Sequence, residues 1–92
     1  MTSRLFAEHN REDVKALAAM GGVAIVPIGA IEQHGPHLPV WTDTLCVEHI
    51  TRAASKQVSD SIPILVTPTL PFGSSDHHLP FGGTISLDTK VL

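Results

Sequence analysis

Apolar residues gather in two uninterrupted runs and in two longer stretches where they recur at helical spacing. The runs, Val23–Ile28 and Ile62–Thr67, are bounded by glycine, proline and other turn residues, as is typical of short buried strands. The spaced stretches, Arg11–Met20 and Thr44–Val58, predict amphipathic helices. This alternation predicts an α/β fold, in which two strands joined by a helix run parallel.

Residues with capping chemistry mark where the predicted helices should begin and end. Asn10 precedes the first helix as a cap, and the pair Gly21-Gly22 ends it. Either Thr42 or Asp43 is expected to cap the second helix. The only cysteine, Cys46, is expected to be a buried apolar residue on that helix.

The strands and the carboxyl-terminal stretch carry further signals. The first apolar run contains no charged residue, which is expected of a strand covered on both faces. Pro27 within it predicts an edge or near-terminal position, because proline has no N–H to donate. The stretch Pro68–Gly83 is predicted to be a loop, and Ser86 is expected to cap a third helix that starts at Leu87.

Composition narrows the class of protein. With 92 residues, 42% of them hydrophobic, the chain is expected to form one small globular domain with a marginal core. The net charge of −3 and the scattered lysines and arginines give no reason to expect a nucleic acid or a membrane as partner. A single cysteine excludes an internal disulfide. No signal-peptide pattern or membrane-length apolar stretch is present, so a cytoplasmic location is expected.

The candidate chemistry lies just after the first apolar run. Glu32, His34, His37 and Asp43 are interleaved with glycine and proline on what should be a loop at the carboxyl end of a strand. Ligands bind at such strand ends in open α/β sheets. Carboxylate oxygen and imidazole nitrogen together favour zinc, manganese or a related divalent ion. The sequence therefore predicts a divalent-metal site.

The spacing of these residues suggests how they share the site. Side chains two apart in an extended segment point the same way, so Glu32 and His34 can face one site together. A loop closed by prolines can bring Asp43 back to them, and a carboxylate can bridge two ions. The alternative for each is an ordinary role, as a solvated loop residue or, for Asp43, as a helix cap.

Further histidines occupy two loops that should lie over the same sheet face. For His37 the alternatives are a metal ligand, a residue that orients a ligand carboxylate or contacts substrate, and a purely structural residue. His77 is a candidate for substrate contact or for orienting a ligand, and His78 is a weaker candidate for the same roles.

Two segments in this order resemble signatures of the creatininase (creatinine amidohydrolase) family. The first is Glu32-Gln33-His34-Gly35-Pro36-His37-Leu38-Pro39 followed by Thr42-Asp43-Thr44. The second is Gly73-Ser74-Ser75-Asp76-His77-His78 followed by Phe81-Gly82-Gly83-Thr84-Ile85-Ser86-Leu87, which is similar to the family's Gly-x-Ser-x-His and Phe-Pro-Gly-Thr segments. Gly82 stands where the family usually has proline. The resemblance runs from about residue 23 to residue 87.

This resemblance implies a three-layer α/β/α domain with a parallel sheet, of which residues 1–92 are expected to be a single, amino-terminal part. It implies a metal-dependent amidohydrolase that uses a water activated by two metal ions to cleave an amide, cyclic amide or formamide. Glu32 would bind one ion, His34 the other, and Asp43 would bridge them, with zinc, manganese or iron as the metal. Family relatives act on creatinine, on formamide-bearing intermediates and on peptides, so a small-molecule amide substrate is expected. The family is typically oligomeric, so a homo-oligomer is expected as well.

The ligand count points to an incomplete site. Glu32, His34 and a shared Asp43 give two ions about two protein ligands each, whereas a catalytic zinc usually has three. The family has a further segment with a histidine and a glutamate ligand, and none follows His78 in this sequence. The chain is therefore expected to be inactive alone, and no catalytic residue is assigned. The alternatives are a non-catalytic remnant and a ligand-binding module.

Overall fold

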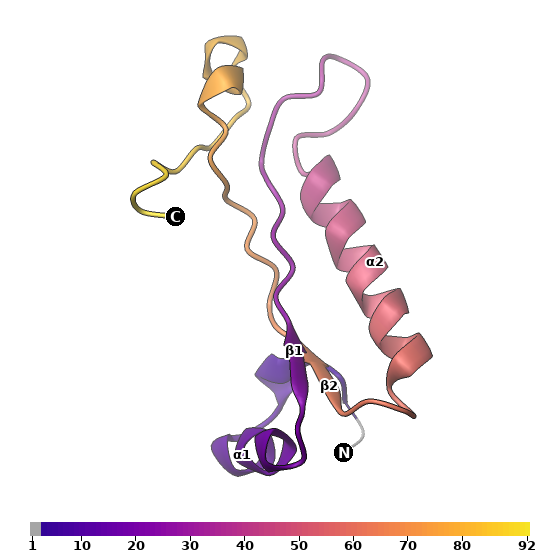
Figure 1. Ribbon diagram of the computed structural model, residues 1–92. Coiled ribbons are helices and arrows are strands. Elements are labelled where there is room, and N and C mark those ends of the chain that lie inside the picture. The colour runs from indigo at the N-terminus through magenta and orange to yellow at the C-terminus, as the bar shows by residue number, and fades with distance from the viewer. Residues whose placement is uncertain (1–2) are drawn as a thin grey trace. The chain divides into compact units, whose positions relative to one another are not determined.

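The computed structural model describes residues 3–92 and divides them into two compact units (Figure 1). One unit contains the chain up to Pro27 together with His49–Pro68, and the other contains Ile28–Glu48 and Thr69–Leu92. The elements are, in order, η1 (Phe6–Glu8), α1 (Arg11–Ala19), β1 (Val23–Ile25), α2 (Thr42–Val58), β2 (Ile64–Val66) and η2 (Asp76–Phe81). The fold is mixed α/β with a small parallel sheet, as the sequence predicted.

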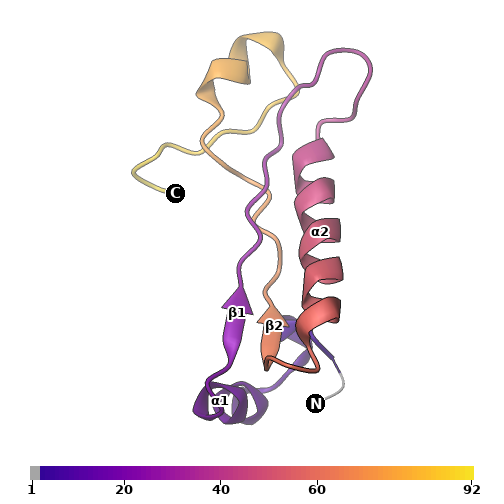
Figure 2. The ribbon, with the colours of Figure 1, turned by 45° about the vertical axis from the view of Figure 1, so that its right-hand side comes forward.

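The sheet of the first unit consists of β1 and β2, which run parallel and side by side (Figure 2). Val23 pairs with Ile64 and Ile25 with Val66. Each strand is three residues long, shorter than its apolar run. The regular pairing of β1 stops before Pro27, which cannot donate to a ladder.

The core of the first unit is centred on β2 and not on β1. All three residues of β2 are buried, with Leu65 only 1% exposed. Val23 of β1 is 48% exposed, so the expectation that β1 is covered on both faces is wrong for the described residues. In this sheet β1 has β2 as its one hydrogen-bonded neighbour, and α1 contributes only Leu17 to the buried set.

Helix α1 begins where the sequence predicted it to begin. The side chain of Asn10 accepts a hydrogen bond from the backbone N–H of Asp13, and the Asp13 side chain accepts one in return from the Asn10 backbone. This reciprocal capping satisfies two N–H groups that have no partner inside the helix. The helix ends at Ala19, and Gly21 adopts a φ of 75° just beyond it. Met20 is 71% exposed, so its predicted place on the apolar face is wrong.

Helix α2 begins at Thr42, two residues earlier than predicted. Thr42 and Asp43 therefore lie inside the first turn and do not precede it as a cap. The hydroxyl of Thr42 donates to the carbonyl of Pro39 at 2.6 Å, which ties the helix start to the preceding loop. Cys46 on this helix is exposed, contrary to expectation.

Extended backbone and turns make up most of the second unit. Ile28 bridges Leu70 in parallel, and Ile31 bridges Ile85 in antiparallel orientation. The Gly29 N–H donates to Leu70 at 2.8 Å. These pairs place the segment before Glu32 beside Leu70, which lies in the loop that the sequence predicted at Pro68–Gly83, and beside Ile85, which lies just beyond that loop. That loop also contains the helical segment η2, which was not predicted.

The predicted third helix does not form. Ser86 instead serves the start of η2, since its hydroxyl accepts from the N–H of Ser75 at 2.8 Å and donates to the carboxylate of Asp76 at 2.5 Å. The residues after it end in a turn, in which the N–H of Lys90 donates to Asp88.

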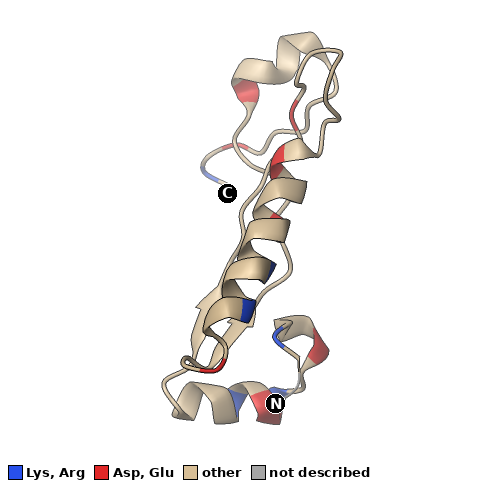
Figure 3. Ribbon diagram, turned by 90° about the vertical axis from the view of Figure 1, so that its right-hand side faces the viewer, with Lys and Arg blue, Asp and Glu red and all other residues tan. Residues whose placement is uncertain are grey.

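Lysine and arginine occur on several separate elements and do not line one of them (Figure 3). Between residues 3 and 92, no helix combines the length and the apolar character that crossing a bilayer demands.

Candidate metal centre

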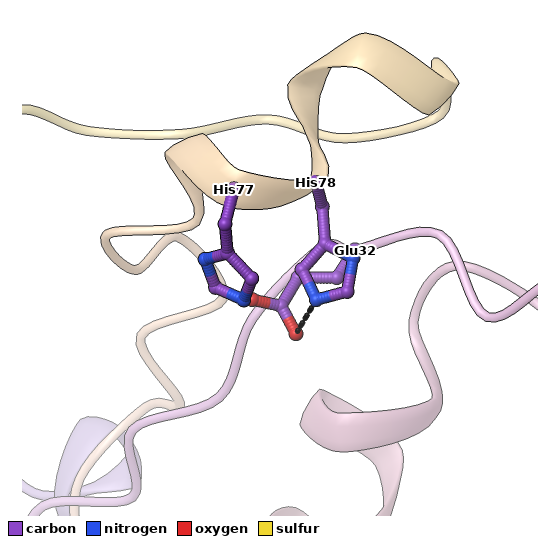
Figure 4. Close-up of side chains that lie close together, drawn as sticks. All are labelled: Glu32, His77 and His78. Carbon is purple, nitrogen blue, oxygen red and sulfur yellow. Dashed lines mark ion pairs between the residues drawn. The ribbon is translucent and has the colours of Figure 1, made fainter.

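Glu32 lies at the end of the extended segment that begins at Ile28, and its N–H donates to the carbonyl of Val40 at 3.0 Å. Its side chain is 17% exposed. Two imidazoles from η2, those of His77 and His78, point at its carboxylate (Figure 4). One ligand atom from each of the three residues lies within 4.8 Å of the other two, and Glu32 Oε1 is 3.8 Å from His78 Nε2.

His34 turns back toward the same segment. Its Nδ1 lies 3.0 Å from the backbone carbonyl of Glu32, and its Nε2 lies 3.5 Å from Oδ2 of Asp43. A carbonyl oxygen only accepts, so Nδ1 carries the hydrogen and neutral His34 has its lone pair on Nε2. A lone pair and a carboxylate oxygen that face each other need a cation or a proton between them. This donor pair fits a divalent metal ion.

Asp43 is positioned by the first turn of α2. Its neighbour Thr44 is buried, and the Thr44 hydroxyl donates to the carbonyl of Ala30 at 2.9 Å and accepts from the Ala30 N–H at 3.2 Å. Gly29 makes this approach possible, because a Cβ at that position would lie 2.5 Å from Thr44 Oγ1. The amino end of α2 is thus fixed against the segment that carries Glu32 and His34.

The pKa of Glu32 is lowered below its usual 4.5. The hydroxyl of Ser75 is the largest cause, and His78, Asp43 and His77 lower the pKa further, while burial acts in the opposite direction. Ser75 is 1% exposed, and its Oγ has no hydrogen-bond partner of ordinary geometry among the described residues. The hydroxyl therefore lies close enough to favour the charged form of Glu32, in a looser contact than an ordinary hydrogen bond. Glu32 is a carboxylate at neutral pH, as a metal ligand must be.

The structure brings together four of the five residues that the sequence singled out. Glu32, His34 and Asp43 lie near one another, and His77 joins Glu32 from η2. His37 is exposed and is not among the residues grouped around Glu32 in the described part of the chain.

Three neighbours were underrated or missed. His78 faces Glu32 at least as closely as His77 does, and Ser75 acts on the same carboxylate. Gln33 contacts His78 through its amide. Ser75 and His78 belong to the second motif and Gln33 belongs to the first, so each carried a signal, but nothing in the sequence indicated the contact between Gln33 and His78.

The fold and the site together define the class of protein. It is a mixed α/β chain with a cluster of carboxylates and imidazoles beyond a parallel strand. The family model for creatininase, described as creatinine amidohydrolase, matches residues 7–92. The chain belongs to the creatininase family.

Two relatives of known name are similar in sequence to this chain. This chain is 38% identical over 74 residues to the mycofactocin precursor peptide peptidase of Mycobacterium tuberculosis. The matched region covers 74% of this chain and 30% of the relative. The chain is 36% identical over 83 residues to the creatinine amidohydrolase of Pseudomonas putida. The matched region covers 83% of this chain and 30% of the relative. The chain thus spans about a third of the length of the relatives it matches.

Solved structures agree on the fold. A manganese form of creatininase superposes with a TM-score of 0.84 at 29% identity, covering 98% of this chain and 36% of the other. A mutant creatininase of Zn–Zn type superposes with a TM-score of 0.75 at 33% identity, covering 99% of this chain and 36% of the other. A mutant creatininase complexed with creatine superposes with a TM-score of 0.75 at 33% identity, covering 98% of this chain and 36% of the other.

Proposed function

We propose that Glu32, His34 and Asp43 supply the amino-terminal ligands of a two-metal site in an amidohydrolase that cleaves a carbon–nitrogen bond. The observation that carries this is the approach of His34 Nε2 to Asp43 Oδ2 at 3.5 Å, with the His34 lone pair directed at the carboxylate. The names of the relatives, a creatinine amidohydrolase and a peptide peptidase, support hydrolysis of an amide.

Each ligand has a distinct part in this proposal. Glu32 would hold one ion and His34 the other, and Asp43 would be shared by both. When bound, the ions lower the pKa of a coordinated water and polarise the amide carbonyl. The chain's own contribution is to keep Glu32 ionised through Ser75, to keep the His34 lone pair on Nε2, and to hold Asp43 between them through Thr44.

Zinc, manganese and iron all suit this donor set. Relatives with Mn and Zn–Zn in their names favour the first two. A small amide or a peptide is the proposed substrate class, and assembly of several copies is proposed as the working state of the enzyme.

The test is metal binding by the 92-residue polypeptide, measured by calorimetry with zinc and with manganese. Asp43→Asn should abolish binding of both ions, because the bridge is lost. Glu32→Gln should weaken one ion at least ~10-fold and leave the other. Asp60→Asn, an exposed Asp in the turn after α2, is the matched control and should bind as the unmodified chain does.

Full metal occupancy in the Asp43→Asn protein would contradict the bridging role. Absence of any metal binding by the folded, unmodified chain would favour the non-catalytic remnant over the hydrolase. Metal-dependent binding of an amide that is recovered unchanged would favour a ligand-binding module.

A further inference from the structure

Gln33 stands between the two proposed ligands Glu32 and His34, and its side chain is held at both ends of its amide. Its Oε1 accepts a hydrogen bond from the N–H of Gly35 at 2.9 Å, and its Nε2 lies 2.9 Å from Nδ1 of His78. Its backbone N–H donates to the hydroxyl of Thr84 at 3.1 Å. Both the side chain and the backbone of Gln33 are therefore fixed, and the amide spans from one motif to the other.

The contact with Gly35 determines which way this amide points. A backbone N–H can only donate, so the atom that faces it must be the carbonyl oxygen of Gln33. Gly35 has a φ of 68°, a conformation that glycine adopts without strain, and there its N–H faces that oxygen. The other end of the amide, which faces His78, is then the NH₂ group.

The orientation of Gln33 fixes in turn the hydrogen on His78. An NH₂ group only donates, so Nδ1 of His78 must accept, and neutral His78 carries its hydrogen on Nε2. Nε2 is the atom that faces Glu32, at 3.8 Å. His78 thus presents an N–H to the carboxylate, whereas His34 presents a lone pair to Asp43.

We propose that Gln33 makes His78 a positioning residue, whose Nε2–H faces the Glu32 carboxylate across 3.8 Å, and so excludes His78 from the metal ligands. The cluster of Glu32, His77 and His78 has the spacing of a three-ligand metal site. Spacing alone would admit His78, but its Nε2 holds a hydrogen and has no lone pair to offer an ion. This assignment rests on the proposed function, in which Glu32 binds metal.

Gln33→Glu tests the assignment directly. A carboxylate at this position still accepts from the Gly35 N–H, but its second oxygen now faces His78 and can only accept. The hydrogen of His78 should therefore move from Nε2 to Nδ1. Long-range proton–nitrogen NMR of the imidazoles, at about pH 9 where histidines are neutral, reads the tautomer of each ring. The variant is needed because imidazole has a tautomer preference of its own. The tautomer of His78 in the unmodified chain would therefore not show by itself that Gln33 sets it.

The controls use residues without this contact. Gln57→Glu, on the exposed side of α2, makes the same chemical change and should leave every imidazole as it is. In the Gln33→Glu protein, His49 should keep its tautomer while His78 changes. An Nε2–H tautomer that persists on His78 in Gln33→Glu would overturn the proposal.

Zinc addition to the unmodified chain gives a second, independent reading that does not require a variant to fold. His34 should lose its free Nε2 signal as the metal binds there, and His78 should keep its Nε2–H. A zinc-bound Nε2 on His78 would overturn the proposal. Failure of zinc to bind at all would contradict the proposed metal centre, while the tautomer of His78 in metal-free Gln33→Glu would still decide the role of Gln33.

Discussion

The hydroxyl of Thr44 forms two hydrogen bonds with one residue, as donor to the carbonyl of Ala30 and as acceptor from its N–H. Thr44 lies in the first turn of α2, and Ala30 lies fourteen residues earlier on the segment that leads to Glu32. One buried side chain therefore sets the distance between the helix that carries Asp43 and the segment that carries the other proposed ligands. The site depends on this contact as much as on the ligands themselves.

Thr44→Val should destabilise the chain and weaken metal binding together. Valine keeps the shape but leaves both polar groups of Ala30 without this partner, a loss of about 1–3 kcal/mol in the free energy of unfolding. Thr44→Ser keeps the hydroxyl and should retain most of the affinity. Urea unfolding and zinc calorimetry on both variants check this. Equal zinc affinity in folded Thr44→Val and Thr44→Ser would show that Asp43 is positioned by something else.

Gly29→Ala should displace Asp43 by steric pressure. Its Cβ would lie 2.5 Å from Thr44 Oγ1 and 2.7 Å from the Thr44 Cα, and the second of these is backbone that cannot move aside cheaply. A suitable control is Gly22→Ala, whose Cβ would meet Leu17 at 2.6 Å in the other unit. Both variants should lose stability, but only Gly29→Ala should lose zinc affinity in the protein that remains folded. Parallel losses of affinity would contradict the specific role of Gly29.

The lowered pKa of Glu32 predicts a component of stability that depends on acid pH. The folded state favours the charged carboxylate, so this component is complete above the usual pKa of 4.5 and is lost as the pH falls below it toward the lowered value. Glu32→Gln removes the component. The difference in the free energy of unfolding between about pH 6 and about pH 3.5 should therefore be smaller in metal-free Glu32→Gln than in the unmodified chain. An identical acid dependence of the two proteins would count against the shift.

Ser75→Ala should raise the pKa of Glu32 toward its usual value, because the Ser75 hydroxyl is the largest of the groups that lower it. The substitution breaks no other hydrogen bond of that hydroxyl among the described residues, so the free energy of unfolding near neutral pH should change by less than ~1 kcal/mol. The measurement is a carbon NMR titration of the Glu32 carboxyl. The exposed neighbour supplies the control, since Ser74→Ala should leave that titration unchanged.

What the sequence predicted correctly was local. Asn10 and Asp13 form a cap from residues three apart, and the parallel pairing of β1 with β2 follows from the order strand, helix, strand along the chain. Ser86 shows the limit of this reasoning. It was expected to cap a helix that starts at Leu87, and that expectation is wrong, because its hydroxyl bonds instead to Ser75 and Asp76 at the start of η2, earlier in the chain.

The candidate site likewise has features that the sequence could predict and features that it could not. Ligand chemistry marked Glu32, His34 and Asp43, because carboxylates and imidazoles between glycines and prolines are visible in a single segment. The partners that set their state come from far along the chain: the amide of Gln33 reaches His78 across 45 positions. No periodicity encodes such a contact. It exists only because Ile31 and Ile85 bring the two motifs side by side.

The last prediction concerns turnover by the 92-residue polypeptide itself. Glu32, His34 and a shared Asp43 give each of two ions about two protein ligands, whereas catalytic zinc normally has three. Ions held this way keep extra water and exchange freely, so they should bind weakly and fail to fix an amide carbonyl and a nucleophilic water in register. We expect no hydrolysis of creatinine, of a formamide or of a peptide by purified monomer with zinc or manganese added. Product formation that disappears in Asp43→Ala would show that these three ligands suffice, and the view of the chain as a partial site would then be wrong.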